Sequence, residues 1–335
     1  VVGLGPMGRS HLRVLDSFAD AGVSVVAVVD PDESRRDDVL RGRGECRGYD
    51  SLAAAAGAES LDFACIATPV QILSQTAAAA LKAGLHVLVE KPMAADLAQA
   101  RELLALAERI PQILMVGLVE RCNPAVRALK EKLAEQHAGR IMQLTARRLG
   151  PFPNRGASAG VALDLAVHDV DVMRYLTNCE VKWVYAEAAS IGQAEDDLLC
   201  ATLRFDDDVI GLLETNWVTP VKVRQLSVTC ERGMFVVDYL SQDLTFYEHP
   251  VKATVWDLLQ GLRGGGEGDM IRYAIERWEP LRLEWEAFFA ATRTGAAVPA
   301  TARDAYEALA VAHAIHESGR DHAAVSPAGH RQPVG

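Results

Sequence analysis

The sequence predicts an α/β protein with two domains: an N-terminal doubly wound parallel sheet, then an α+β domain with a large, mostly antiparallel open sheet. Three observations predict this fold class. The chain of 335 residues is too long for one ordinary domain, apolar runs alternate with helical stretches up to about residue 120, and later apolar runs are separated only by tight turns. We therefore expect domains at 1–120 and 121–325, followed by a disordered tail at 326–335.

The first domain has four apolar runs of strand length. Residues 23–29 (VSVVAVV) form a continuous β-branched run, which is typical of a strand buried on both faces of a parallel sheet. The other runs lie at 61–68, 86–89 and 113–119. Helical stretches at 32–41, 70–82 and 96–109 separate them, so the sequence predicts consecutive βαβ units.

The second domain has a different pattern. After a helix expected at 124–136, seven strand-like runs follow at 141–149, 181–190, 198–205, 209–217, 223–229, 234–240 and 244–247. Close strands joined by short turns predict an antiparallel sheet. One helix at 163–176 interrupts the strands, a glycine-rich connection is expected at 261–269, and helices are expected at 279–292 and 302–318.

Composition excludes several classes of protein. Lys and Arg (34) against Asp and Glu (45) give a net charge of −11, which argues against a nucleic-acid partner because such a protein needs a basic face. No apolar run reaches the roughly 18 residues of a membrane helix. The six cysteines are scattered without a CxxC pair, which predicts reduced thiols and a cytoplasmic location. The chain opens at Val1 without a methionine, and we expect a few residues to precede it.

A glycine motif stands at the start of the chain. Gly3-Leu-Gly5-Pro6-Met7-Gly8 reads GxGxxG where a first strand would turn into a first helix. Gly3 would permit the tight turn, Gly5 would let the backbone approach a pyrophosphate, and Gly8 would allow close packing of helix on strand. The pyrophosphate would then lie at the helix N-terminus. The alternative is an ordinary βα turn.

Asp30 strengthens this interpretation because it ends the second strand, 22 residues beyond Gly8. A carboxylate at this place binds the ribose hydroxyls of a dinucleotide and repels a 2′-phosphate, so it favours NAD over NADP. Arg35 and Arg36 leave NADP possible, although both also fit solvated positions on the next helix.

Glu90-Lys91-Pro92 follows the strand at 86–89. A lysine at the carboxyl end of a parallel strand lies in the crevice where such sheets bind ligands, whereas an isolated lysine would more often lie on a surface loop. Another strand ends in Ala67-Thr68-Pro69, which would flank the nicotinamide at the same edge.

Asp164 and His168 are four residues apart on an expected helix and therefore share one face. An imidazole beside a carboxylate can take a hydroxyl proton near neutral pH, as hydride transfer from an alcohol requires. The alternatives are an exposed ion pair and a metal site. We expect no metal, because further ligands at suitable spacing are absent from the sequence.

In these motifs, the chain resembles the glucose–fructose oxidoreductase/inositol dehydrogenase/MocA (Gfo/Idh/MocA) family. The resemblance rests on three motifs in order: the glycine motif extended to His11, Glu90-Lys91-Pro92, and Asp164-x-x-x-His168. It implies a Rossmann domain, a C-terminal domain whose open sheet commonly forms the oligomer interface, and NAD(P)-dependent chemistry on a sugar or cyclitol carbon. It further implies that Lys91 orients substrate and cofactor, that Asp164 positions the sugar and that His168 is the acid/base, with Glu90 beside the cofactor.

Four further segments are similar to the branch of this family that oxidises the 3-hydroxyl of UDP-N-acetylglucosamine. They are 117–124, 148–153, 164–173 and 216–220, and Cys122 departs from the aromatic residue expected at its place. The likeness implies a cofactor contact for Arg121 and a UDP-sugar substrate, whose diphosphate Arg148 and Arg155 would suit. A free sugar, sugar phosphate or cyclitol is the alternative substrate, and a non-catalytic NAD-binding sensor is the alternative of another class. We expect a homodimer or homotetramer.

Overall fold

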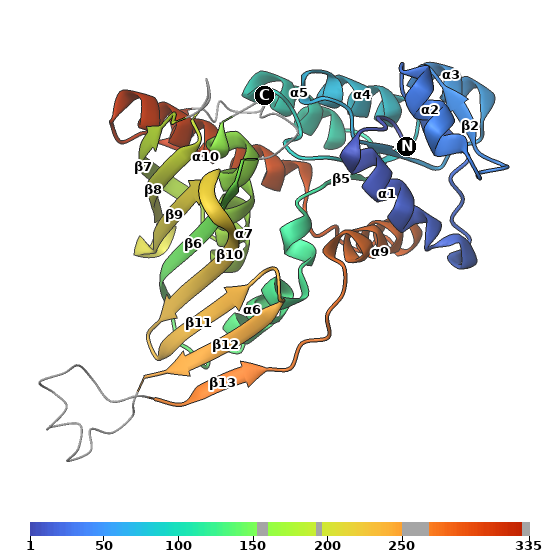
Figure 1. Cartoon of the computed structure of the whole chain (residues 1–335). Coiled ribbons are helices and arrows are strands. Elements are labelled where there is room, and N and C mark those ends of the chain that lie inside the picture. Colours follow the sequence, from blue (N-terminus) through green and yellow to red (C-terminus); the bar gives the residue numbers. More distant parts are fainter. Residues whose placement is uncertain (153–159, 192–195, 250–267, 330–335) are drawn as a thin grey trace, which may run out of the picture. The chain divides into compact units, whose positions relative to one another are not determined.

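The computed structural model describes residues 1–152, 160–191, 196–249 and 268–329. These residues form two compact units, shown in Figure 1. The first unit comprises Val1–Cys122 and Glu279–Leu309, and the second comprises Asn123–Trp278 and the segment that begins at Ala310. Arg155, expected to contact substrate, and most of the glycine-rich connection at 261–269 lie outside the described residues.

A parallel sheet forms the centre of the first unit. Its strands are β1 (Ala27–Val29), β2 (Arg47–Tyr49), β3 (Phe63–Ile66), β4 (His86–Val89) and β5 (Leu114–Val116). β1 pairs with β2, and β3, β4 and β5 pair in that order. Val2 bridges both Val29 and Ile66 and thereby joins the two groups. Because every pair is parallel, the carboxyl ends of the strands share one edge of the sheet, as the sequence predicts.

Three helices of the first unit begin at a residue whose side chain caps them. Asp32, Ser51 and Asp96 accept backbone N–H groups in the first turns of α2 (Glu33–Leu40), α3 (Leu52–Ala58) and α5 (Leu97–Ala107). The remaining helices are α1 (Pro6–Asp16), α4 (Val70–Lys82), α9 (Pro280–Thr294) and the beginning of α10 (Ala302–Asp321), with short 3-10 turns at η1 (Ala19–Ala21) and η2 (Val119–Cys122).

Helix α9 supplies a large part of the core of the first unit. Trp285, Phe288 and Phe289 pack with Phe18 in a cluster that also contains Cys65, Leu88 and Met115. Complete burial of such side chains stabilises by about 1.5–3 kcal/mol each. Residues 279–309 thus belong to the first unit, whereas the sequence predicts that they are part of a second domain at 121–325.

An eight-stranded sheet dominates the second unit. Its order is β13-β12-β11-β10-β6-β9-β8-β7, and every neighbouring pair is antiparallel except β6 with β9. The strands are β6 (Ile141–Pro151), β7 (Val181–Ala189), β8 (Leu198–Phe205), β9 (Ile210–Asn216), β10 (Val218–Cys230), β11 (Gly233–Asp238), β12 (Asp243–Glu248) and β13 (Met270–Tyr273). The large, mostly antiparallel sheet expected from the sequence is thus confirmed.

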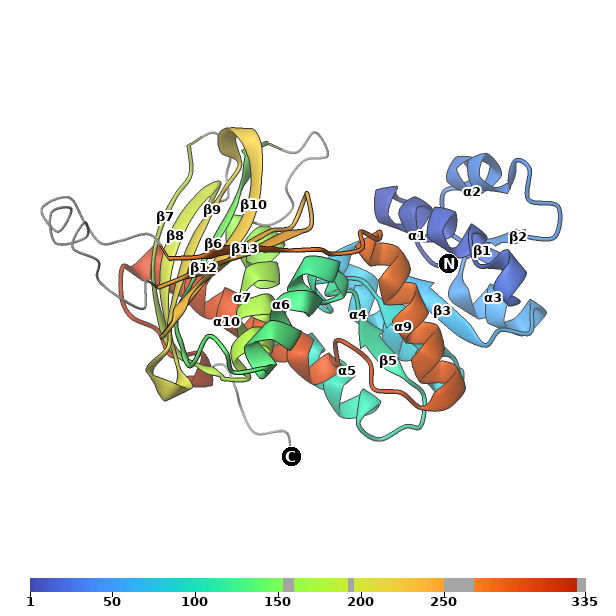
Figure 2. The same ribbon diagram turned by 90° about the horizontal axis from the view of Figure 1, so that it is seen from below.

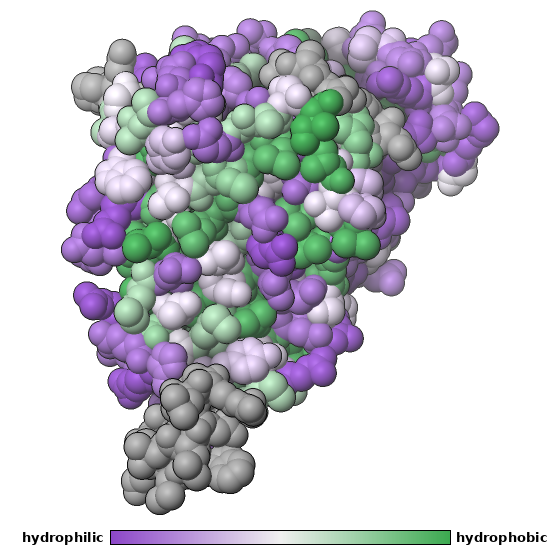
Figure 3. Space-filling view, turned by 60° about the vertical axis from the view of Figure 1, so that its left-hand side comes forward, coloured by the Kyte–Doolittle hydropathy of each residue, from purple (hydrophilic) through white to green (hydrophobic). Residues whose placement is uncertain are grey.

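Helices cover one face of this sheet. Figure 2 shows the sheet close to edge-on, with α6 (Pro124–Ala134) and α7 (Val167–Thr177) together on one side. Residues such as Leu144, Leu203 and Val228 face that side and are fully buried. Figure 3 looks onto the other face, where hydrophobic side chains lie among hydrophilic ones.

Three elements of the structure are not predicted from the sequence. β2 and α3 carry Gly or a run of small residues, and β13 is a four-residue edge strand, so none shows a clear apolar periodicity. The tail expected to be disordered from residue 326 begins as a 3-10 turn, η5 (Pro327–Gly329), while 330–335 lie outside the described residues. In the part of the chain that the structure describes, no helix is long and apolar enough to cross a membrane.

Candidate functional site

The glycine turn has no room for a side chain at Gly3 or Gly8. Gly3 has φ +90°, and a Cβ there would lie 2.4 Å from the carbonyl oxygen of Ala67. A Cβ on Gly8 would lie 1.8 Å from the carbonyl oxygen of Gly3. By contrast, an added Cβ on Gly5 would meet nothing within 4 Å. The turn is therefore tight on the side of the sheet and open at Gly5, where a phosphate would approach.

Helix α1 begins at this open place. Gly5 is its N-cap, Pro6 is its first residue, and its first turn carries neither a side-chain cap nor an acidic residue. The backbone N–H groups of the first turn, that of Met7 included, thus have no intrahelical partner, and the helix dipole adds partial positive charge. This arrangement suits an anion such as a pyrophosphate.

Asp30 lies beside the glycine turn, directly after β1, and is nearly buried. Its Oδ2 accepts the N–H of Leu4 at 2.8 Å, and its Oδ1 accepts the N–H of Asp32 at 3.0 Å. A carboxylate has about four acceptor positions, so the side chain retains capacity for ribose hydroxyls. Arg35 Nη1 is 3.8 Å from Oδ2, on a side chain that is half exposed.

The end of β3 contacts the same turn. Ala67 donates its N–H to the carbonyl oxygen of Val2 at 2.8 Å, and Thr68 follows before Pro69 caps α4. The Thr68 hydroxyl oxygen is buried and has no hydrogen-bond partner among the described residues. A buried polar group without a partner is costly, so this hydroxyl is available to a ligand at the sheet edge.

Glu90 and Lys91 come directly after β4, at this edge. Glu90 donates its N–H to Ile66, and its Oε2 accepts the N–H of Lys91 at 3.1 Å. The Lys91–Pro92 peptide bond is cis. The structure therefore brings together the glycine turn, Asp30, Thr68 and Lys91 at the carboxyl edge of one sheet. Together, the open glycine turn, the unpartnered hydroxyl and the nearby carboxylate fit a dinucleotide.

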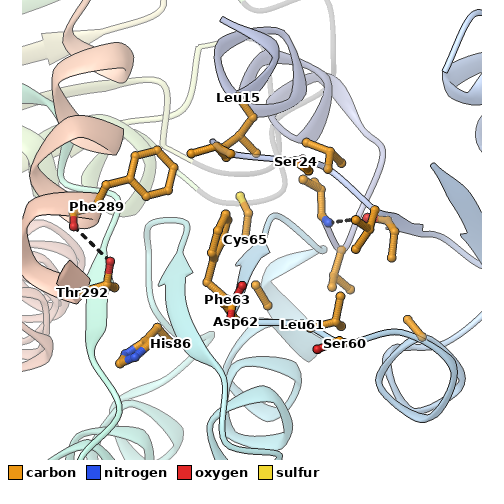
Figure 4. Close-up of a pocket in the computed structure, with 18 of the residues that line it drawn as sticks. Leu15, Ser24, Ser60, Leu61, Asp62, Phe63, Cys65, His86, Phe289 and Thr292 are labelled. Atoms are coloured by element: carbon orange, nitrogen blue, oxygen red, sulfur yellow. Dashed lines mark hydrogen bonds between the residues drawn. The ribbon is translucent and has the colours of Figure 1, made fainter. Parts of the chain in front are cut away.

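A cavity in the first unit lies away from this edge of the sheet. It has a volume of about 650 Å³, and its lining includes Ser24, Asp62 and His86, which lie before or at the start of β1, β3 and β4. In Figure 4, His86 lies below Thr292 of α9, Asp62 lies near Phe63 at the centre, and Ser24 lies on the opposite side near Leu15. Since Ser24, Asp62 and His86 mark the amino ends of β1, β3 and β4, this cavity is at the edge opposite the glycine turn and is not the dinucleotide site.

Asp164 and His168 lie on the helical segment of the second unit, but its geometry differs from the expected α-helix. Residues Ala162–Ala166 form a π-helical turn (η3), and α7 starts at Val167. Asp164 therefore stands on the π turn and His168 in the first turn of α7. Both side chains are partly exposed, whereas Ala166, Val167 and Val170 are buried. Such π turns occur frequently at functional sites.

Two arginines expected to contact ligands have internal partners. Arg148 is buried, and its Nε and Nη2 lie 2.6 and 3.0 Å from the two carboxylate oxygens of Asp169. Arg121 donates from Nη1 to the carbonyl oxygen of Pro299 at 2.9 Å, and its Nη2 is 3.1 Å from Asp304. These contacts favour structural roles for both guanidinium groups. The roles expected of them in substrate and cofactor binding stay predictions.

Sequence reasoning gave no role to three buried residues near Lys91. His11 of α1 and Trp285 of α9 form a hydrogen bond, and Glu284 is buried beside them with the Glu90 charge nearby. His11 belongs to the extended glycine motif, so its position was visible in the sequence. Trp285 and Glu284 lie more than 260 residues after α1 in the sequence, and nothing in their neighbouring residues indicates a contact with that helix.

Comparisons with known proteins agree with this geometry. Residues 1–118 match a family described as "Oxidoreductase family, NAD-binding Rossmann fold", and residues 126–236 match the "GFO/IDH/MocA C-terminal domain". The UDP-N-acetylglucosamine 3-dehydrogenase of Acidithiobacillus ferrooxidans is 27% identical over 247 residues, 74% of this chain and 75% of the relative. Its solved structure has a TM-score of 0.81 at 24% identity and covers 95% of both chains.

Other relatives are named for different substrates. The myo-inositol dehydrogenase Hyg17 of Streptomyces leeuwenhoekii is 28% identical over 335 residues, 95% of this chain and 96% of the relative. The WlbA dehydrogenase of Bordetella pertussis, solved with NADH and UDP-GlcNAcA, has a TM-score of 0.79 at 20% identity and covers 97% of both chains. The two family matches together span more than half of the residues, and the chain therefore belongs to the Gfo/Idh/MocA family of oxidoreductases.

Proposed function

We propose that this oxidoreductase transfers a hydride between a secondary alcohol of a sugar and NAD. The observation that carries the proposal is the common edge of the sheet beside the open glycine turn. There, Asp30, Thr68 and Lys91 follow the ends of β1, β3 and β4. Ligands of doubly wound sheets bind at this edge. When bound, NAD supplies the acceptor for the hydride that leaves the carbinol carbon.

Residues of the first unit would hold the dinucleotide. The N–H groups at the start of α1 would bind the pyrophosphate, and Asp30 would accept the adenosine ribose hydroxyls. Ala67, Thr68 and Pro69 would flank the nicotinamide. The Asp30 carboxylate favours NAD over NADP, since it would repel a 2′-phosphate.

Lys91, Asp164 and His168 would act on the alcohol. His168 takes the hydroxyl proton as the C–H bond transfers its hydride, and it returns that proton in the reverse direction. The Lys91 ammonium stabilises the negative charge that develops on the oxygen, and Asp164 accepts a neighbouring hydroxyl and positions the sugar. These roles follow from the family resemblance and from the chemistry of the side chains.

For the substrate, we propose the 3-hydroxyl of a UDP-N-acetylhexosamine. The likeness of segments 117–124 and 216–220 to that branch supports it, as does the Acidithiobacillus relative. A cyclitol is the second candidate, because the match to Hyg17 extends over 95% of this chain. The two relatives have nearly the same identity to this chain but act on different substrates, so identity does not choose between these substrates.

A turnover panel tests the proposal. The purified protein is incubated with NAD and, separately, with UDP-N-acetylglucosamine, UDP-N-acetylgalactosamine, glucose 6-phosphate, glucose and myo-inositol, and NADH formation is followed by absorbance. We expect turnover with the UDP-sugars. If myo-inositol is the only compound turned over, the substrate is a cyclitol and not a UDP-sugar. If calorimetry shows NAD binding but no compound is turned over, the protein is better described as a non-catalytic NAD-binding sensor.

The open face of the eight-stranded sheet supports a homo-oligomer. Trp183 and Tyr185 of β7, Ile210 of β9 and Tyr247 of β12 are exposed large hydrophobic residues of this unit. Apolar side chains spread over an uncovered sheet face are typical of a protein interface. We propose a dimer or tetramer in the cytoplasm, and sedimentation measurements test the assembly.

A further inference from the structure

A chain of hydrogen bonds joins helix α9, helix α1 and the Lys91 turn within the first unit. His11 of α1 is fully buried at its centre. Trp285 Nε1 donates to His11 Nδ1 at 3.0 Å, and His11 Nε2 lies 2.8 Å from Glu90 Oε1. The other Glu90 oxygen, Oε2, accepts the backbone N–H of Lys91 at 3.1 Å.

Burial lowers the pKa of His11 while the neighbouring Cys65 and Glu90 raise it, with a net rise. The hydrogen bond from the indole nevertheless requires an Nδ1 without a hydrogen, and it decides the assignment. An indole N–H is a donor and never an acceptor, so Nδ1 of His11 must accept and carries no hydrogen. The hydrogen of the neutral imidazole is therefore on Nε2, which donates to Glu90. Trp285 thus selects the tautomer of His11, and His11 presents an N–H to the Glu90 carboxylate.

Glu90 consequently faces two donors, the Nε2–H of His11 and the N–H of Lys91. Only a group with two acceptor oxygens satisfies both, which is what an ionised carboxylate offers and an amide does not. Gly117 closes the other side of this carboxylate: a Cβ on Gly117 would lie 3.4 Å from Glu90 Oε2. The Glu90 side chain is therefore held on three sides, and it holds the first peptide of the turn that carries Lys91.

We propose that His11 and Glu90 are positioning residues that fix the Lys91 turn relative to helix α1. The proposal rests on the role of Lys91 in the proposed function. Helix α1 offers its N-terminus to the pyrophosphate and, about one and a half turns later, its His11 to Glu90. The same rigid helix would thus set the distance between the bound dinucleotide and the ammonium of Lys91.

Conservative and disruptive variants of His11 separate this role from simple packing. In His11→Gln, the amide oxygen can accept from Trp285 while the amide nitrogen donates to Glu90, so both contacts are retained. In His11→Leu, the side chain can do neither. His86→Leu is the matched control, because His86 also accepts a backbone N–H, that of Ile113 at 3.0 Å, but at the opposite end of β4.

We expect His11→Leu to lower kcat by about 10- to 100-fold, the cost of a misplaced catalytic group, with an unchanged Kd for NAD. His11→Gln should recover most of that kcat, and His86→Leu should lower thermal stability without a comparable loss of kcat. A loss in His11→Leu no greater than in His86→Leu would overturn the positioning role.

Glu90→Gln and two measurements without substrate cover the case in which His11→Leu does not fold. Because the amide cannot accept both hydrogen bonds, amide hydrogen exchange at Lys91 in the enzyme without NAD should become faster in Glu90→Gln and stay slow in His86→Leu. In the wild type, ¹⁵N spectra should show His11 protonated on Nε2 alone. A hydrogen on Nδ1, or unchanged exchange at Lys91, would contradict the proposal.

Lys91→Met distinguishes a failure of the proposed function from a failure of the positioning role. If this variant retains wild-type kcat, the role of Lys91 in the proposed function is wrong. If Lys91→Met is inactive while the His11 and Glu90 variants keep full activity and slow exchange, the proposed function stands and the positioning role is wrong.

Discussion

Arg148 and Asp169 form a buried, two-pronged ion pair between β6 and α7 of the second unit. Both side chains are at most 5% exposed, and the guanidinium also stacks over the Tyr239 ring, with 5.5 Å from its central carbon to the ring centre. A neighbouring pair, Arg147 of β6 with Glu214 of the adjacent strand β9, is exposed instead. The two pairs allow burial to be tested while the chemistry is held constant.

Asp169→Asn should destabilise the protein by about 3–5 kcal/mol, because it removes the carboxylate charge from a buried ion pair with a guanidinium. Glu214→Gln should change stability by less than about 1 kcal/mol, since water already screens that pair. Denaturant unfolding of both variants measures the difference. Equal effects of the two substitutions would show that the Arg148–Asp169 pair has no special importance for stability.

The stability of the protein should depend on pH through Glu284. Burial raises the pKa of this carboxyl to about 8, with the nearby Glu90 charge contributing. Between the ordinary pKa of a glutamate, about 4.3, and about 8, the folded protein keeps a proton that the unfolded chain has lost. Stability should therefore fall as pH rises through this window, by up to about 1.4 kcal/mol per pH unit.

Glu284→Gln removes that titration. We expect the free energy of unfolding of the variant, minus that of the wild type, to increase from pH 5 to pH 8, and urea unfolding at each pH measures it. Glu286→Gln is the control, because Glu286 is an exposed neighbour on the same helix. A difference that stays constant with pH would mean that Glu284 is not a protonated buried acid.

His168→Ala should lower kcat by roughly 10²- to 10⁴-fold, the contribution of a general base, while the Kd for NAD stays unchanged. His137→Ala, at an exposed position of the same unit, should have wild-type kinetics. Steady-state rates with the substrate found in the panel, together with calorimetric titration of NAD, give both quantities. If His168→Ala retains more than about a tenth of the wild-type kcat, His168 is not the general base.

Asp30→Ser should shift the preference from NAD towards NADP. The substitution removes the carboxylate that would repel a 2′-phosphate and leaves Arg35 beside the site. We expect the ratio of kcat/KM for NAD over NADP to fall at least about tenfold, or 1.4 kcal/mol. Asp38→Ser, on the exposed face of α2, serves as the control. A wild type that already prefers NADP would make Arg35 or Arg36 the residue that reads the 2′-position.

Local patterns in the sequence predict the parts of the site that depend on local geometry. The spacing of Gly3, Gly5 and Gly8 describes a turn whose tightness comes from contacts within a few residues and the adjacent strand. The positions of Asp30 and Lys91 follow from the rule that parallel strands end at one edge. These predictions need only secondary structure and the direction of the strands.

The parts that depend on distant contacts were not predictable. The partner of Arg148 is an aspartate 21 positions later on a helix, so its charge alone suggested a phosphate contact. The π turn at Ala162–Ala166 has the same apolar pattern as an α-helix, because one inserted residue barely changes the periodicity. The bond between His11 and Trp285 spans 274 positions and has no signature in either segment.

The packing of α9 onto the first unit has a consequence for biosynthesis. A ribosome makes residues 1–122 first, yet Trp285 and Phe288, both fully buried in that unit, are made more than 150 residues later. During this interval the nascent N-terminal segment exposes the apolar surface that α9 later covers, and such exposed surface favours aggregation. A fragment that ends at Cys122 should accordingly be a poor substitute for the isolated dinucleotide-binding unit, whereas one that also includes Glu279–Leu309 through a short linker should fold.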